Sequence, residues 1–420
     1  DSVASRGLGD VYKRQSTSRC IKVERVAEAR DKNPERTDQE NDLIRRGGQA
    51  PLAIMADRAS GVLVGQACGN ALGVGYEFKT PPLEGTPRMQ GAAGRLSPGE
   101  WSEATQLGIC IAEVAVTGID LTTEEGLDAV ATRYLAWYHG GTRKIDAPTR
   151  VVLETTSNDI SNMNPARKMR SAAAYFHLRT RRTSGAGPLS RCAILGLTRI
   201  KDPQWTAESV RAVTELTHVD PLSSEAAVIY TEAIRRAVTD PLPGEETWVN
   251  RINLGAGIAL LPTDRREQWC EWLQQAEETY FKPPRDNTYA VTALQAVAGI
   301  LQAVKIEHAE MPLSGQDAFR RATSLAVQLG GATDTIAGLV GALFAAGIGL
   351  AQIPADLQTK LHGWPGLKAD ALAEMGLGTA LAGVVGTHGM ARMIASASSL
   401  HDLIAAHPDA EVDAMTTPEP

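Results

Sequence analysis

The stretch AVQLGGATDTIAGLVGAL, residues 326–343, decides the fold. A pair of glycines leads into Thr333, Asp334 and Thr335, and the chain then carries no charged residue between positions 336 and 353. A membrane-spanning helix takes roughly 17 to 25 apolar residues, but the positive charges that usually flank a span are missing here. Small residues recur along the run, so a helix formed there can be packed closely on all sides. We therefore predict a buried core helix that opens at Asp334.

Alanine-rich segments with helical spacing of apolar residues fill the chain around this helix. From about residue 55 to residue 405, alanine is abundant and alternation of apolar and polar residues is rare. In ATQLGICIAEVAV, for example, Leu107, Ile111 and Val114 fall on one face of a helix. There is no fixed repeat and no internal linker, so the sequence predicts a single compact all-α domain over residues 55–405.

The two ends of the chain differ from this domain. Residues 1–15 contain LGDVYKRQ, which resembles a translated sequencing adapter of the kind found at the edges of metagenomic assemblies, and we leave them out of the fold prediction. The chain starts at Asp1, as a fragment would, and shows no apolar run that would serve as a signal peptide. Residues 16–54 are predicted to form a charged tail and residues 406–420 a disordered tail.

Charge and cysteine content limit the classes of partner. The net charge of −7 and the lack of a basic stripe make nucleic acid an unexpected partner, because phosphate binding needs clustered Lys and Arg. The five cysteines are widely separated and contain no C-x-x-C, so they favour neither a disulfide framework nor a zinc site. We expect a cytoplasmic protein that takes a small or acidic-surface partner and no membrane.

Two segments place acids at the start of a predicted helix. One is Asp334 with Thr335, and the other is GEWSEATQLG, residues 99–108, which carries Ser102 and Glu103. A side-chain oxygen at such a position can accept hydrogen bonds from unpaired backbone N–H groups, and a negative charge suits the helix dipole. Considered singly, each motif is therefore better explained as a helix cap than as a ligand.

A third segment changes this interpretation. DRASGVLVGQACGNALGVGYEF, residues 57–78, precedes the other two, and the order of the three resembles the ADP-ribosylglycohydrolase family, which includes the enzymes that reactivate ADP-ribosylated dinitrogenase reductase. In that family a helix reading roughly G-x-x-x-G-D-A-L-G leads to a loop glutamate, a later W-T-D-D-T opens a second helix, and a late G-G-D-T-D-T opens a third. The chain matches these in order with residues 65–73, Glu77, residues 101–105 and residues 330–335. The resemblance extends over roughly residues 55–400, with further likeness in YLAWYHGGTRKIDAPTR, GPLSRCAILGL and LTHVDP.

The resemblance implies a function and a set of site residues. Family members hold two magnesium or manganese ions at helix ends, and these orient the ribose hydroxyls and a water while the bond from ribose C1 to an acceptor is hydrolysed. The implied partners are ADP-ribose and ADP-ribosylated protein. Carried over position by position, the metal ligands are Ser102, Glu103, Asp334 and Thr335, and Glu77 or Glu103 activates the water. The implied substrate-binding residues are Asn70, Gly187, Ser190, Arg191, Gly330 and Gly331.

The sequence departs from the family pattern at five positions, of which Ser102 keeps a hydroxyl and Glu103 lengthens a carboxylate by one methylene, and the other three lose a carboxylate. Ala104 and Ala332 stand where the family has carboxylates, and Asn70 replaces the aspartate of G-D-A-L-G. The remaining carboxylates are too few for a well-occupied pair of divalent ions, so we expect one weakly bound Mg or Mn ion or none. Asp146 is a candidate replacement acid or a loop residue, and His218 is a candidate base or a structural histidine.

Three functional hypotheses follow from these residues. The first is a divergent ADP-ribosyl hydrolase that works with one metal ion. The second is a pseudoenzyme, or a module that binds ADP-ribose or another nucleotide, which has lost the dinuclear site. The third is a protein that keeps only the helical fold for contacts with partners. We favour the hydrolase, and the pseudoenzyme is the alternative that the two alanines support.

Overall fold

The computed structural model describes residues 52–79, 83–140, 145–158, 164–181, 183–240, 248–279 and 286–396, with no description of side chains beyond residue 384. The predicted adapter, the predicted disordered tail and most of the predicted charged tail lie outside the described residues. The first described helix begins at Leu52, three residues before the predicted domain start.

The described part of the chain is helical apart from one short ribbon, so the predicted all-α class is confirmed. The α-helices are α3 (Leu52–Gly73), α4 (Glu103–Ala115), α5 (Glu124–His139), α6 (Ala147–Ser157), α7 (Pro165–Thr180), α8 (Gly187–Arg191), α9 (Pro203–Glu215), α10 (Pro221–Thr239), α11 (Trp248–Arg251), α12 (Thr263–Glu278), α13 (Ala290–Glu310), α14 (Gly315–Gln328), α15 (Thr333–Ile348), α16 (Ala355–Gln358) and α17 (Ala369–Ser396). Short 3-10 helices are η1 (Ala193–Leu197), η2 (Leu254–Leu260) and η3 (Leu350–Gln352). Strands β1 (His362–Gly363) and β2 (Leu367–Lys368) form an antiparallel pair.

Several of these helices begin at an aspartate followed by a proline in the first turn. Asp146, Asp202 and Asp220 each accept a hydrogen bond from a backbone N–H group in the first turn of the helix that follows. The carboxylate satisfies a donor that has no partner within the helix, and proline at this point removes another such donor. The sequence therefore fixes where α6, α9 and α10 start.

Glycines bring α3 and α15 into backbone contact at the centre of the molecule. A Cβ atom added to Gly69 would lie 1.8 Å from the carbonyl oxygen of Ala337, and one added to Gly65 would lie 2.4 Å from that of Gly341. Any larger residue at these positions would force the two helices apart, because backbone atoms cannot yield as the end of a side chain can. α15 is buried along almost its whole length, which confirms the predicted core helix.

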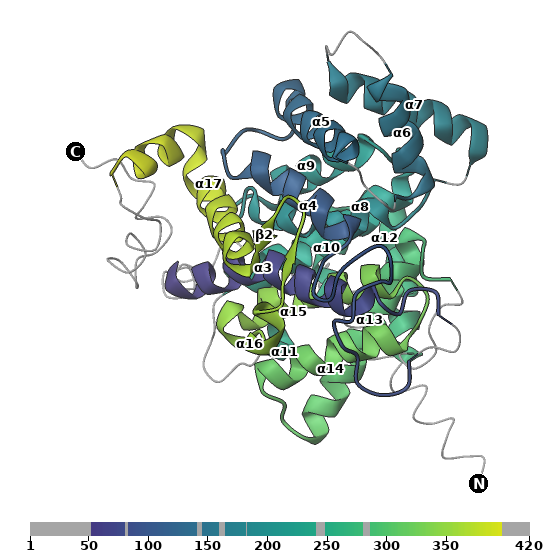
Figure 1. The fold of residues 1–420 in the computed structure, drawn as a ribbon, viewed down its shortest axis with the longest axis vertical. Helices are drawn as coiled ribbons and strands as arrows, with labels where there is room; N and C mark the ends of the chain where they lie inside the picture. Colours follow the sequence, from purple (N-terminus) through teal and green to yellow (C-terminus); the bar gives the residue numbers. More distant parts are fainter. Residues whose placement is uncertain are drawn as a thin grey trace, which may run out of the picture.

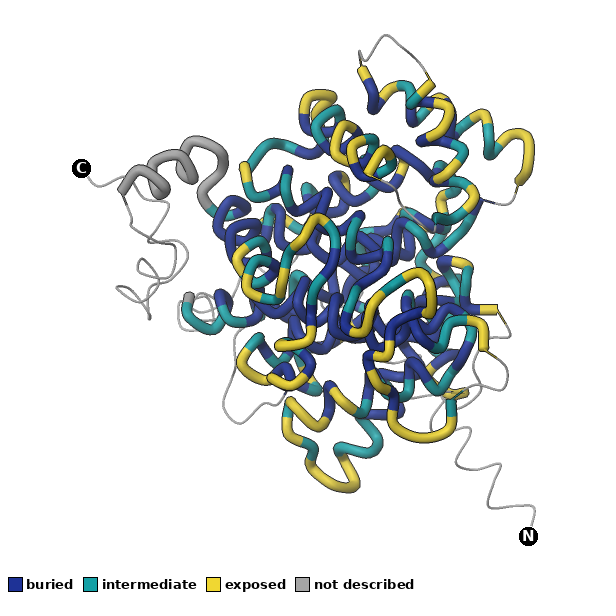
Figure 2. The backbone as a smooth tube through the Cα atoms, in the orientation of Figure 1, coloured by how far each residue is buried: buried dark blue, intermediate teal, exposed yellow. Residues whose placement is uncertain are grey.

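The remaining helices lie on either side of this pair. In Figure 1, α5, α6 and α7 lie above α3 and α15, whereas α13, α14 and α16 lie below them. Figure 2 shows that the buried backbone is concentrated around the central pair and that the exposed segments lie at the periphery. α17 packs against α3, and α14 packs against α15.

One described helix is long and apolar enough to cross a membrane by length and composition. It is α13, and 61% of its most apolar window is buried inside the protein, as in the core helix of a globular domain. This is weak evidence for a span, since core helices meet the same criteria. α15 is apolar but shorter.

Candidate functional site

Three helix ends meet beside the central pair, and a polar side chain stands at each. Asn70 lies in the last turn of α3, Ser102 immediately precedes α4, and Asp334 lies in the first turn of α15. All three side chains are nearly inaccessible to solvent, at 0%, 3% and 1% exposed. Segments separated by more than two hundred residues in the sequence are thus joined at one point. We call these three residues the junction cluster.

Direct hydrogen bonds link the junction cluster. The Asn70 amide Nδ2 donates to Ser102 Oγ at 2.8 Å, and Ser102 Oγ donates to Asp334 Oδ2 at 3.0 Å. The backbone N–H of Ser102 donates to Asn70 Oδ1 at 2.6 Å. Ser102 makes no side-chain capping bond to α4, so the capping explanation of this motif is wrong for Ser102. The other oxygen of Asp334, Oδ1, accepts from the Thr335 N–H at 2.8 Å.

A pocket opens on one side of the junction cluster. It has a volume of about 190 Å³. Its lining includes Glu77, Ser102, Glu103 and Asp334. The structure therefore brings these four residues, which come from all three motifs, to a single cleft, as the order of the motifs in the family pattern suggests. Its other lining residues are Val74, Ala92, Arg95, Leu96, Glu100, Gln106, Trp137, Gly140 and Trp364.

The pocket is acidic with aromatic walls. Four carboxylates line it, and Arg95 is the one cation among its described lining residues. The indole Nε1 of Trp137 donates to Gln106 Oε1 at 2.8 Å, and the carbonyl of Trp364 accepts from Trp101 Nε1 at 3.1 Å. These bonds fix both aromatic residues relative to α4. The pocket suits a ligand group that carries positive charge and presents a flat face.

The comparisons with known proteins agree with this arrangement. The family model described as ADP-ribosylglycohydrolase matches residues 51–388. The chain belongs to the ADP-ribosylglycohydrolase family. Membership confirms the hydrolase class that the three motifs predict.

Individual relatives of the family show how far the likeness extends. The chain is 24% identical over 315 residues to ADP-ribosylarginine hydrolase Tri1 of Serratia proteamaculans (strain 568), across 74% of this chain and 77% of that protein. It is 32% identical over 93 residues to ADP-ribosylarginine hydrolase Tri1 of Pseudomonas putida (strain GB-1), across 21% of this chain and 24% of that protein. A solved structure named as an ADP-ribosylglycohydrolase-related protein complex superposes with a TM-score of 0.56 at 23% identity, covering 78% of this chain and 99% of that one. This last similarity supports the fold alone.

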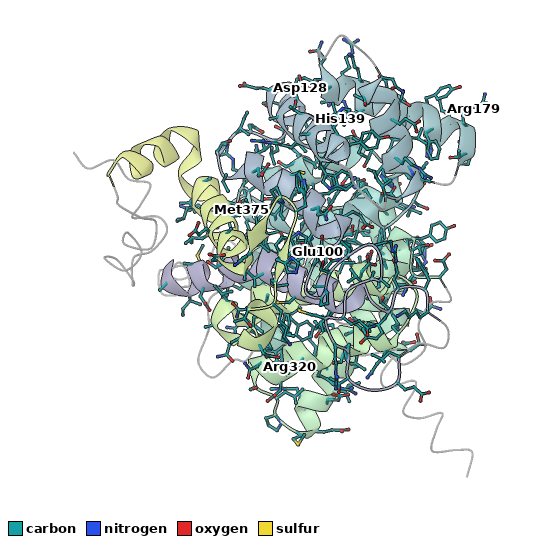
Figure 3. All side chains as sticks on the ribbon, in the orientation of Figure 1. Glu100, Asp128, His139, Arg179, Arg320 and Met375 are labelled. Carbon is teal, nitrogen blue, oxygen red and sulfur yellow. The ribbon has the colours of Figure 1, made fainter. Side chains whose placement is uncertain are left out.

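Sequence reasoning missed several lining residues of this family member. Glu100 directly precedes the W-S-E-A-T motif, so its position beside a site motif could have identified it. Figure 3 labels Glu100 near the centre of the view. Arg95 and Leu96 come from the loop before α4, and Trp364 comes from the turn between β1 and β2. No local pattern links that turn to the motifs, since only tertiary packing brings it over the pocket.

Several residues that the family resemblance assigns to substrate or metal binding lie elsewhere. Asn70 holds the junction cluster together and is not among the described lining residues of the pocket. Gly330 and Gly331 adopt left-handed backbone conformations before α15, with φ of 78° and 71°, and they too are absent from the lining, as is Thr335. These residues are close to Asp334 in the sequence or hydrogen-bonded to it, but they do not line the pocket.

The segment around α8 also differs from expectation. Gly187, Ser190 and Arg191 are not among the described residues that line the pocket. The Ser190 hydroxyl donates to the carbonyl of Gly187 at 2.8 Å. Arg191 is 2% exposed, donates to the hydroxyls of Thr149 and Thr217, and stacks over the ring of Tyr134. A guanidinium enclosed in this way cannot reach a diphosphate without unpacking the core, so the expected substrate contact is not supported here.

Arg191 and His218, both buried, form a second polar group with the half-buried Asp146, and we call these three residues the capping cluster. Asp146 caps α6 by accepting from the Thr149 N–H at 3.0 Å, and His218 Nε2 lies 3.5 Å from Asp146 Oδ1. Burial, offset in part by the Asp146 carboxylate, lowers the pKa of His218 to about 4. Burial alone would raise the pKa of Asp146, but attraction from His218 and Arg191 lowers it. His218 lies outside the pocket lining, and a ring with so low a pKa is only a weak base near pH 7, so the structural interpretation is favoured over a general base.

The donor set at the junction cluster does not fit a pair of divalent ions. Across the described ranges, no three His, Cys, Asp or Glu side chains are placed to hold one ion. Ala104 and Ala332 are nearly buried and contribute no oxygen. Both carboxylate oxygens of Asp334 already accept protein hydrogen bonds. The expected Mg or Mn ion at Ser102, Glu103, Asp334 and Thr335 stays a prediction, and we derive no step through it.

Proposed function

We propose that this family member hydrolyses the N-glycosidic bond between ADP-ribose and an arginine side chain of a modified protein. The observation that carries the proposal is the convergence of Glu77, Glu103 and Asp334, from three separate segments, on one acidic pocket. Two relatives are named as ADP-ribosylarginine hydrolases, which supports arginine as the acceptor. A guanidinium group is cationic and planar, and the carboxylates and the two tryptophans of the pocket suit both properties.

The chemistry of the bond explains the need for carboxylates. Cleavage at ribose C1 passes through a transition state with positive charge on the sugar ring, as in other glycoside hydrolyses. Fixed negative charges in a partly enclosed pocket stabilise that charge. Water adds its oxygen to C1 as the bond from C1 to nitrogen breaks, and a carboxylate takes one proton from that water and passes it to the leaving nitrogen. Glu103 and Glu77 are the carboxylates that we assign to the water.

A binding module without turnover is the alternative. The alanines at positions 104 and 332 favour it, because each removes a carboxylate that the family pattern provides. Such a protein would bind free ADP-ribose in the same pocket and release no product from a modified peptide.

Release of ADP-ribose from an ADP-ribosylarginine peptide, followed by mass spectrometry, tests the proposal. We expect Glu103→Gln and Glu77→Gln to lower the rate on the order of 100-fold or more, because each loses a proton acceptor but keeps its shape. Asp334→Ala should abolish turnover and leave the helix content in circular dichroism unchanged. Glu113→Gln is the matched control, since Glu113 lies on α4 like Glu103 but pairs with Arg133 outside the pocket lining. Binding of ADP-ribose in calorimetry without release from the peptide would establish the binding module instead.

We also propose a cytoplasmic location and no nucleic-acid partner. The net charge of −7 supports the absence of a nucleic-acid partner, and the absence of any C-x-x-C supports the cytoplasmic location. Cys68, Cys110 and Cys192 are buried, and burial raises the pKa of each thiol, which keeps these side chains unreactive.

A further inference from the structure

An amide occupies the point where α3, α4 and α15 meet, although the family pattern places a carboxylate there. Asn70 is fully buried, and it uses both of its amide donors and its carbonyl oxygen within the junction cluster. Its Nδ2 donates to Ser102 Oγ at 2.8 Å and to the carbonyl oxygen of Asp334 at 3.3 Å, and its Oδ1 accepts from the Ser102 N–H at 2.6 Å. Only a group with both donors and an acceptor can make these three bonds.

A carboxylate at position 70 would not fit these partners. Two of the three contacts are made by the amide donors, and an ionised aspartate has no donor to replace them. It would also bring a second negative charge close to Asp334, in a place where both are shielded from water. Burying two like charges is unfavourable unless a cation lies between them. An aspartate at this point therefore calls for a bound cation, and an asparagine does not.

The neighbouring alanines reinforce this difference. Ala104 follows Ser102 by two residues and Ala332 precedes Asp334 by two, and both are nearly buried. Together with Asn70, they leave Asp334 as the sole carboxylate of the junction cluster. Magnesium and manganese take about six ligands, mostly oxygens, and bind through at least one or two carboxylates. An ion bound to Asp334 Oδ2 would have to share that oxygen with the Ser102 hydroxyl, which already donates to it.

We infer that the Asn70 amide does the work of a divalent cation in this chain, holding Ser102 and Asp334 together so that the pocket forms without metal. The inference concerns the same pocket as the proposed function but does not depend on turnover. It assigns Asn70 as a positioning residue, since the side chain acts through Ser102 and Asp334 and lies outside the pocket lining.

The thermal midpoint of unfolding tests the inference directly. The wild-type protein should show the same midpoint, within about 1 °C, in 1 mM EDTA and in 1 mM manganese chloride, because a ligand that does not bind the folded state cannot shift unfolding. Asn70→Asp should lower the midpoint in EDTA by about 5 °C or more, as expected for a buried unpaired charge. Manganese should recover at least half of that loss, because the ion neutralises the new pair of carboxylates.

Asn287→Asp provides the matched control. Asn287 is also buried, and it bonds the Gly330 carbonyl and the Ala332 N–H beside the same helix start. An aspartate there should lower the midpoint as well, but it contacts neither Ser102 nor the Asp334 carboxylate in the bonds made by Asn287. Manganese should leave this variant unchanged, so a general stabilising effect of the ion is distinguished from binding at the junction cluster.

Three results would overturn the inference. One is stoichiometric manganese binding to the wild type in titration calorimetry, a measurement that holds even if Asn70→Asp does not fold. The others are an Asn70→Asp variant as stable as the wild type in EDTA, and a destabilised, folded variant that manganese does not recover.

A rate assay separates this inference from the proposed function. Hydrolysis by the wild type in EDTA supports both, and hydrolysis only with added manganese overturns the inference alone. Absence of hydrolysis under either condition contradicts the proposed function, while the unfolding midpoints still decide the inference.

Discussion

The junction cluster is buried, and the capping cluster is buried except for Asp146, whose side chain is 35% exposed. Both clusters come from motifs that the sequence singles out, yet they differ in what surrounds them. Asn70, Ser102 and Asp334 carry one formal charge between them, and two of the three border the pocket. Asp146, Arg191 and His218 are three titratable groups, and none is among the described residues that line it. The comparison shows that motifs of similar residue types differ in whether their helix end opens on a cavity. Elsewhere the same residue types hold helices together.

The capping cluster connects four parts of the upper half of the fold. Arg191 ends α8, Asp146 caps α6, Tyr134 lies on α5, and Thr217 with His218 lies between α9 and α10. The Arg191 guanidinium donates to hydroxyls of two of these parts, Thr149 on α6 and Thr217 between α9 and α10. The cluster should therefore matter most for stability, and the junction cluster most for the chemistry of the pocket.

Removing the central cation should produce the largest change in stability. Arg191→Met keeps much of the side-chain volume but leaves Asp146 without a neighbouring positive charge and two hydroxyls without a donor. We expect a loss of about 3 kcal/mol in the free energy of unfolding, at the lower end of the usual cost of breaking a buried charged pair, because the Asp146 side chain is 35% exposed. Urea unfolding followed by circular dichroism measures it.

Arg133→Met is the control for this substitution. Arg133 pairs with Glu113 at 3.3 Å, but its side chain is 53% exposed, so the loss should be about 1 kcal/mol or less. A loss of similar size for both variants would show that the capping cluster is not a structural anchor.

The fold and part of the site could be predicted from the sequence for definite physical reasons. Helix periodicity and the glycines of α3 and α15 are local signals for the helices and for their close packing. The order of the family motifs predicted that Glu77, Glu103 and Asp334 would lie together, and they line one pocket. The role of Arg191 could not be predicted, because a guanidinium beside small residues looks the same in a binding loop and in a core. Trp364 was missed for a related reason, since its place depends on how the ribbon packs over α4.

The pH dependence of stability should show the next largest effect. Burial lowers the pKa of His218 to about 4 from 6.5, and Asp146 and Arg191 are the charged groups that act on it. Between these two values the unfolded chain binds a proton that the folded protein does not, so stability falls as the pH falls. This shift alone should cost on the order of 2 kcal/mol between pH 7 and pH 5. The lowered pKa of Asp146 acts only below its ordinary value of 3.8, outside this range.

Unfolding curves at pH 7 and pH 5 for the wild type and His218→Asn measure this contribution. The variant should be less stable at pH 7 but lose less on acidification than the wild type. His139→Asn is the control, because His139 is an exposed residue at the end of α5 and its replacement leaves His218 in place. Equal losses of stability on acidification in the wild type and in His218→Asn would mean that His218 is not a neutral ring in the folded protein.

The smallest effect should come from the weaker of the two hydroxyls that Arg191 contacts. The Arg191 guanidinium lies 3.4 Å from Thr149 Oγ1, which is a long hydrogen bond. Thr217 Oγ1, in contrast, also forms a hydrogen bond with His218 Nδ1, at 2.9 Å. Thr149→Val keeps the shape and the backbone N–H that Asp146 caps, and it removes the long bond together with the side-chain hydrogen bond from Thr149 to Asp146. We expect a loss of about 0.5 to 1 kcal/mol in the free energy of unfolding, against roughly twice that for Thr217→Val. The two variants compared by urea unfolding rank the contacts of the guanidinium. A larger loss for Thr149→Val than for Thr217→Val would reverse the ranking and make the start of α6 the main support of Arg191.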